Sequence, residues 1–339
     1  MNGFLKKSNG VPMAVFTASL LSLFHGSAYA DECPSEDFSQ FLPAFSTNAE
    51  TQQRLTAMTI KSLVLKPEGE GGTLQPQTTE ISSSTLAFPL MAPLATDKTD
   101  GVEVETIDDS HVNVVDKRAG NSNIKIFNFS RQACWVLEGV ENWSINDKDL
   151  VEATTPTLST AENFCYQRAR TYGRLGGLDK YSLTGELFEA ALENYLCAAA
   201  SGDPQASLSA ASLSLSGMAS QLETEKVEAL FKAAATTLAS GASALSTFYC
   251  YGNDPDPEGP CQHPEEAERE LIRAASMGSS DAQNKLGDTF ETGRLVTKDA
   301  SRALDCYRLA ASKGNAIALS NLTRLKSQTA DATETSHCY

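Results

Sequence analysis

Two cysteines, Cys250 and Cys261, bracket an acidic segment rich in proline and glycine in the second half of the chain. Asp254, Asp256 and Glu258 alternate within it, and carboxylate oxygens are ligands that calcium prefers. The segment lacks the glycine placement and carbonyl spacing of an EF-hand loop, so we do not predict a metal site. We predict instead a local disulfide that closes the segment. In the chain-entropy picture this bond stabilises the fold by about 2–3 kcal/mol.

The cysteine count predicts further disulfides and an oxidising compartment. The chain has eight cysteines, an even number, and all of them follow residue 30. The sequence leaves their connectivity open, and a buried free thiol is the alternative at each position. The candidate pairs, besides Cys250 with Cys261, are Cys165 with Cys197, Cys306 with Cys338, and Cys33 with Cys134.

Catalytic motifs are absent from the sequence. It contains no G-x-S-x-G elbow, no H-E-x-x-H zinc motif and no C-x₂-C pair, and the histidines after residue 30 are His111, His263 and His337. We therefore predict no catalytic residue, no metal site and no cofactor, and hence a protein that is not an enzyme.

The first 30 residues have the features of a secretory signal peptide. Lys6 and Lys7 precede an apolar run at 11–24 that is too short to cross a bilayer. Ala28-Tyr29-Ala30 then supplies the small-x-small cleavage signal. We expect cleavage after Ala30 and a periplasmic or secreted protein. The alternative is an amphipathic helix at the start of the fold.

The charge balance limits the classes of partner. The chain carries a formal net charge of −16, which disfavours nucleic acid and anionic lipid. We expect no transmembrane segment in the mature chain, and a protein partner that is basic or tolerant of acid. The oligomeric state cannot be derived from the composition.

Residues 31–150 are predicted to form an α+β domain. Apolar residues at near-helical spacing before residue 57 indicate one or two helices. Period-two alternation with β-branched and aromatic residues then predicts a curved antiparallel sheet. Residues 66–80, rich in Gly, Pro, Glu, Gln and Thr, are expected to be an exposed loop. The predicted strands are 59–66, 101–107, 111–115, 124–129 and 134–140.

The last predicted hairpin resembles that of small cone-shaped domains of the nuclear-transport-factor-like type. The resemblance rests on Phe127-Asn128-Phe129, the run 134–140 and Trp143. Such a cone either holds a ligand or is packed shut, so the resemblance implies no particular chemistry. We interpret Trp135 and Trp143 as core or cone-rim residues, with a ligand platform as the alternative.

The second half repeats at an interval of 36 residues. Ala274-Ala275-Ser276 returns as Ala310-Ala311-Ser312, and Gly278 returns as Gly314. A period of this length is typical of solenoids built from helix–turn–helix units. Small residues are expected where helices approach closely, and glycines where helices end.

The stretch 282–314 resembles the Sel1-like (SLR) repeat almost position by position, and the same frame fits the preceding chain. We predict an all-α solenoid over 160–326, with about four units and a closing helix, followed by a tail at 327–339. The resemblance implies a non-enzymatic adaptor or scaffold that binds other proteins. Solenoids offer their partners an extended surface, and the polar side of the first helix in the last unit is the candidate. Its predicted binding residues are Lys285, Asp288, Thr289 and Glu291.

The sequence leaves two alternative functions open. The resemblance is also compatible with an immunity protein or inhibitor that neutralises a secreted bacterial toxin. A hydrolase with its site in the cone-like domain is the alternative from a different class. A cluster of buried polar residues in that domain would favour the hydrolase.

Overall fold

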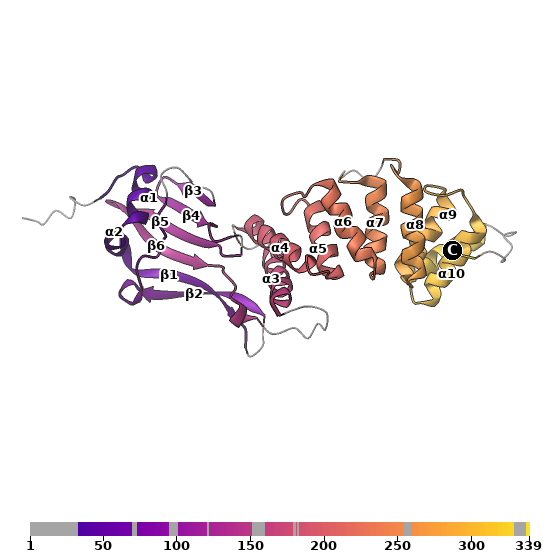
Figure 1. Ribbon diagram of the computed structural model, residues 1–339, viewed down its shortest axis with the longest axis horizontal. Coiled ribbons are helices and arrows are strands. Elements are labelled where there is room, and N and C mark those ends of the chain that lie inside the picture. Colours follow the sequence, from indigo (N-terminus) through magenta and orange to yellow (C-terminus); the bar gives the residue numbers. More distant parts are fainter. Residues whose placement is uncertain are drawn as a thin grey trace, which may run out of the picture.

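The computed structural model describes residues 33–69, 73–94, 101–120, 122–150, 160–178, 181, 183–253, 259–328 and 337–339. The expected signal peptide and its cleavage position lie outside these ranges, as do Asp254, Asp256 and Glu258. The molecule is elongated, with a sheet at one end and a row of helices leading away from it (Figure 1). Among the residues that the structure describes, none of the helices combines the length and the apolar character needed to span a bilayer.

The first half is two short helices and a six-stranded sheet. Asp37 and Asn48 cap the two helices, because their side chains accept hydrogen bonds from the first free backbone N–H groups. The strand order is β2-β1-β6-β5-β4-β3. The elements are α1 (Phe38–Thr47), α2 (Ala49–Arg54), β1 (Thr56–Pro67), β2 (Leu74–Ser82), β3 (Val102–Asp108), β4 (His111–Asp116), β5 (Lys125–Arg131) and β6 (Trp135–Asn142).

The sheet differs from the expectation in two respects. It is mixed, because β1 runs parallel to β6 while the other neighbours are antiparallel. The expectation of a loop throughout 66–80 is wrong, since β1 extends to Pro67 and β2 begins at Leu74. As an edge strand, β2 needs little apolar character and tolerates Pro76. It therefore lacks the hydrophobic alternation by which a half-buried strand is recognised.

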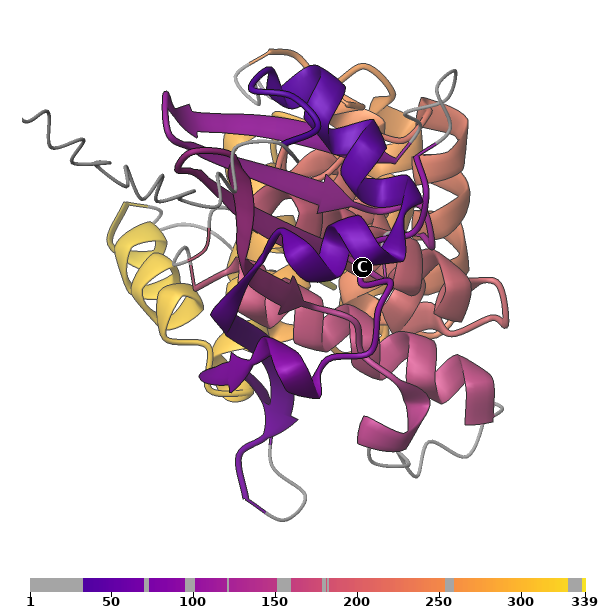
Figure 2. The ribbon, with the colours of Figure 1, turned by 90° about the vertical axis from the view of Figure 1, so that its left-hand side faces the viewer.

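Both faces of the sheet are covered at least in part. On one face α1 brings Phe41 and Phe45 against Phe129 and Phe38 against Trp135, and the ring centroids of Phe45 and Phe129 are 5.1 Å apart. On the other face Trp143 belongs to a cluster with residues of the first two helices of the second half. Figure 2 shows α1 and α2 in front of the sheet and the helical half behind it.

The second half is a series of helices of the kind expected for an SLR solenoid. Gly293 and Gly314 end α9 and α10 with φ of 77° and 86°, a left-handed conformation that glycine adopts without steric cost. The helices are α3 (Thr160–Gly176), α4 (Thr184–Ala199), α5 (Pro204–Leu215), α6 (Thr224–Ala235), α7 (Ala239–Tyr251), α8 (Pro264–Ser276), α9 (Ser280–Thr292), α10 (Ala300–Ser312) and α11 (Ala316–Gln328).

Small residues let neighbouring helices approach closely. Ala303 and Ala310 on α10 are fully buried. At Gly287 on α9 an added Cβ would lie 2.7 Å from the ring of Tyr307, closer than two carbon atoms can pack. The alanines and glycines of the repeat therefore set the spacing between its helices.

Four disulfide bonds join the cysteines in the candidate pairs derived above. Cys33–Cys134 ties the segment before α1 to the start of β6, and Cys165–Cys197 joins α3 to α4. Cys306–Cys338 fastens the end of the chain to α10. Cys250–Cys261 closes the long connection between α7 and α8. No cysteine is left free.

Candidate ligand pocket between helices α7 and α9

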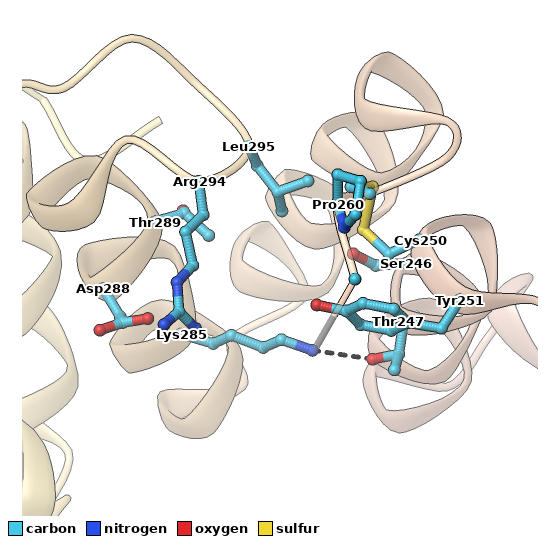
Figure 3. Close-up of a pocket in the computed structure, with 12 residues that line it drawn as sticks. Ser246, Thr247, Cys250, Tyr251, Pro260, Lys285, Asp288, Thr289, Arg294 and Leu295 are labelled. Atoms are coloured by element: carbon cyan, nitrogen blue, oxygen red, sulfur yellow. Dashed lines mark hydrogen bonds between the residues drawn. A yellow bond between two sulfur atoms is a disulfide. The ribbon is translucent and has the colours of Figure 1, made fainter. Parts of the chain in front are cut away.

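A pocket of about 620 Å³ lies between the first helices of two successive repeat units (Figure 3). Each of α7, α9 and the two segments that follow these helices contributes part of the wall. The residues that line it are Ser246, Thr247, Cys250 and Tyr251 of α7, Gly259, Pro260 and Cys261 after it, Lys285, Asp288 and Thr289 of α9, and Arg294 and Leu295 after that helix.

Helix α9 supplies one wall through residues three and four positions apart. Lys285, Asp288 and Thr289 lie on one face because an α-helix turns once in 3.6 residues. Ser279 caps the helix at its start, and the left-handed Gly293 ends it. The chain reverses at this glycine, so that Arg294 and Leu295 also line the pocket.

The opposite wall depends on the Cys250–Cys261 disulfide. Cys250 lies in the last turn of α7, and its bond to Cys261 holds Pro260 beside that helix. The backbone N–H of Gln262 also donates to the carbonyl oxygen of Cys250 at 3.0 Å. The connection after α7 is longer than the matching connection after α9. The disulfide and this hydrogen bond hold its last residues, among them Pro260, in the wall of the pocket.

Two cationic side chains enter this pocket. Lys285 extends across it from α9, and its Nζ donates a hydrogen bond to Thr247 Oγ1 at 2.7 Å (Figure 3). Burial of the ammonium lowers the pKa of Lys285, an effect that the nearby Asp288 carboxylate opposes. Arg294 points back from the loop after α9. Within the described ranges, neither Lys285 nor Arg294 forms an ion pair.

The structure brings three of the four predicted binding residues to this pocket. Lys285 and Asp288 reach it from the exposed side of α9. Thr289 is buried, and its hydroxyl donates to the carbonyl oxygen of Leu286 at 2.8 Å. Glu291 lies elsewhere, as described below. That these residues bind a partner remains a prediction.

Sequence reasoning missed the residues that reach the pocket from other segments. Thr247 and Tyr251 belong to the preceding unit, and Arg294 and Leu295 follow the helix end. The repeat frame aligns α7 with α9, so it could have indicated that α7 supplies the facing wall. The side chains after Gly293 have no comparable periodic signal.

Glu291 connects three successive helices. Its carboxylate accepts hydrogen bonds from Arg324 of α11 at 2.5 and 2.7 Å and from the hydroxyl of Tyr307 of α10 at 2.8 Å. The hydrogen bonds from Arg324 hold the pKa of Glu291 below its usual range. This residue therefore stabilises the end of the solenoid, and its side chain is not free to bind.

We expect Glu291→Gln to destabilise the protein at neutral pH and to have a smaller effect in acid. A carboxyl group with a lowered pKa in the folded state stabilises it above the unfolded pKa, and this stability is lost as the pH falls through the folded pKa. Urea unfolding between pH 7 and pH 3 should show the wild-type and variant free energies converging below about pH 4. Glu68→Gln, at an exposed position after β1, is the control. A constant difference across this range would contradict the assignment.

A second polar cluster lies on the sheet. Asp108 contacts His111 Nδ1 at 2.9 Å, and His111 is the cross-strand neighbour of Ser130. These residue types resemble the parts of a hydrolytic triad, but the hydroxyl of Ser130 donates to Glu138. The histidine side chain is about half exposed, at 55%. The cluster as arranged does not activate a serine nucleophile, because the base is not bonded to the hydroxyl.

The described residues hold no group of three or more His, Cys, Asp and Glu side chains that could bind a metal ion. Of the described residues that line the pocket between α7 and α9, Asp288 alone supplies a carboxylate. Its chemistry is that of hydrogen-bond donors and positive charge.

Comparison with known proteins identifies the last full unit. The family model of the Sel1 repeat matches residues 280–315, which comprise α9 and α10. No curated protein sequence matches the chain. None of these findings bears on the resemblance of the first half to cone-shaped domains, which remains a prediction.

Solved structures that match part of the chain include two bacterial proteins. One is a Sel1 repeat protein from Oxalobacter formigenes, with 22% identity and a TM-score of 0.38 over 50% of this chain and 67% of that chain. The other is c5321, a protective antigen of uropathogenic Escherichia coli with an SLR fold, with 22% identity and a TM-score of 0.37. The second match covers 50% of this chain but 37% of the antigen. The chain is thus a protein with an α+β first half and a series of SLR-type helices in which residues 280–315 form a Sel1 repeat.

Proposed function

We propose that this protein is an extracytoplasmic, non-enzymatic scaffold whose helical repeats bind another protein. The observation that carries the proposal is the position of the pocket, one wall of which is built by the Sel1 repeat at 280–315. Sel1 repeats are protein-interaction modules, and stacking leaves their outer surface available to a partner. Lys285 and Asp288 are the residues proposed to face that partner.

The four disulfides support a location in an oxidising compartment. We propose that the expected signal peptide directs the protein to the periplasm or the exterior. The net charge of −16 favours a partner with a basic surface around the contact. Binding through this surface should weaken as salt screens the charges.

Site-specific cross-linking in the full-length protein tests the proposal. A photoreactive amino acid at Asp288 is expected to capture a protein partner in envelope extract, and less of it at high salt. The matched control is the same probe at Glu80, an exposed position on the edge strand β2. Capture from position 80 but not from position 288 would place the interaction on the sheet and refute the proposal.

A further inference from the structure

The described residues that line the pocket between α7 and α9 carry a net positive charge in a strongly acidic protein. Lys285 and Arg294 contribute two positive charges and Asp288 one negative charge, within a chain of −16. A cation that is partly removed from water, as the ammonium of Lys285 is, is usually neutralised by a neighbouring carboxylate. In the described part of the chain no carboxylate forms an ion pair with either cation.

The donors in the pocket converge from three segments. The ammonium of Lys285 uses one hydrogen bond on Thr247, and an ammonium group has three N–H donors. Arg294 adds a planar fork of donors that matches a carboxylate in shape. The ring of Tyr251 lies alongside, with its hydroxyl directed into the same space (Figure 3). Leu295 and Pro260 form an apolar wall.

We infer that this pocket binds a carboxylate group presented by a peptide segment of the partner, held by Lys285 and Arg294 with its aliphatic stem against Leu295. The inference rests on the proposed function and identifies the chemistry of the anchor. A monoanion fits better than a dianion such as phosphate, because the charges of the described lining residues sum to +1 and a dianion would leave a negative charge uncompensated by them. A basic partner surface and an acidic anchor are compatible, since they meet different parts of the protein.

Capped tripeptides test the inference in the full-length protein. The probes are acetyl-Gly-Ala-Glu-amide, acetyl-Gly-Ala-Ala with a free C-terminus, the neutral acetyl-Gly-Ala-Gln-amide and a phosphoserine analogue. Binding is followed by NMR titration, which measures weak dissociation constants. We expect at least one of the two carboxylate probes to bind more tightly than the neutral probe. Tighter binding of the glutamate peptide would identify a side-chain carboxylate as the anchor, and tighter binding of the peptide with a free C-terminus would identify a terminal carboxylate. A neutral or phosphorylated probe that binds as tightly as both carboxylates overturns the inference.

Charge-neutral variants locate the site. Lys285→Gln and Arg294→Gln are each expected to raise the dissociation constant of the carboxylate probe by about tenfold or more, because charge-assisted hydrogen bonds are among the strongest in proteins. Lys298→Gln removes an equal charge from an exposed position that does not line the pocket, and should leave binding unchanged. Equal affinities in all three variants would refute the site.

The outcomes separate this inference from the proposed function. If the probe at position 288 captures a partner but neither carboxylate peptide binds, the inference fails and the scaffold function stands. If a carboxylate peptide binds but no protein is captured, the scaffold function fails and the pocket is a small-molecule carboxylate site.

Discussion

Replacing Cys33 and Cys134 by serine is expected to lower the free energy of unfolding by about 4–5 kcal/mol. The two cysteines are 101 residues apart in the sequence, so their bond removes much of the freedom of the unfolded chain. Both side chains are partly exposed, and serine should fit there without strain. Urea unfolding at neutral pH, or the thermal midpoint if the variant is too unstable for urea, measures the loss.

The Cys250–Cys261 bond provides the matched comparison. It spans 11 residues, and its removal by two serines is expected to cost about 2–3 kcal/mol. Intact mass after alkylation, with and without reductant, should first show that all eight thiols of the wild type are blocked. Equal losses for the two double variants would contradict the chain-entropy account, and free thiols in the oxidised protein would contradict the disulfide framework itself.

The helical half could be predicted well because each unit carries a local signal. Gly293 and Gly314 mark helix ends through a backbone conformation that few other residues adopt. Ala303 and Ala310 mark close approaches between helices. Positive-φ glycines recur at Gly202, Gly217, Gly252 and Gly278, so several units support the same frame, although the turn after α6 contains no glycine.

The sheet was harder to predict because its pairing is not local. The parallel contact of β1 with β6 pairs residues that are 78 to 81 positions apart in the sequence, and nothing in either strand specifies that neighbour. Edge strand β2 has a polar composition without the hydrophobic alternation that predicts a strand. In both cases tertiary context decides the structure, and a single sequence does not contain that context in readable form.

Only the part of the candidate site that lies on one helix could be predicted from the sequence. Lys285 and Asp288 follow from the periodicity of one helix. Tyr251, Arg294 and Pro260 reach the pocket through the stacking of two units and through a disulfide-closed connection. Those positions depend on how the units are stacked, which the helical period does not give.

The two halves of the protein share a hydrophobic cluster. Ile126 and Trp143 of the sheet half pack in one cluster with Tyr172 of α3 and Leu187 of α4. The hydroxyl of Tyr172 donates to the carbonyl oxygens of Ser122 and Trp143 at 2.9 and 3.0 Å. The first helix pair thus belongs to the core of the sheet as well as to the solenoid, and it joins the repeats to the sheet.

This shared cluster leads us to expect that Leu187→Ala destabilises both halves. Leu187 is fully buried, and truncating a buried leucine costs about 2–5 kcal/mol. Hydrogen exchange should show protection falling together in β5, β6, α3 and α4. Leu286→Ala is the matched control, since Leu286 is equally buried but belongs to the cluster of the later repeats.

The control should lower protection in α9 and its neighbours while the sheet keeps its own, because stability in a solenoid is transmitted mainly between adjacent units. If Leu187→Ala left the exchange of β5 and β6 unchanged, the sheet would be stable without the first helix pair. The halves would then be independent units, and the cluster around Trp143 would be a surface contact. If protection falls in β5, β6, α3 and α4 together, the sheet and the first helix pair form one cooperative unit. Damage to the core of the sheet would then also destabilise the first unit of the solenoid.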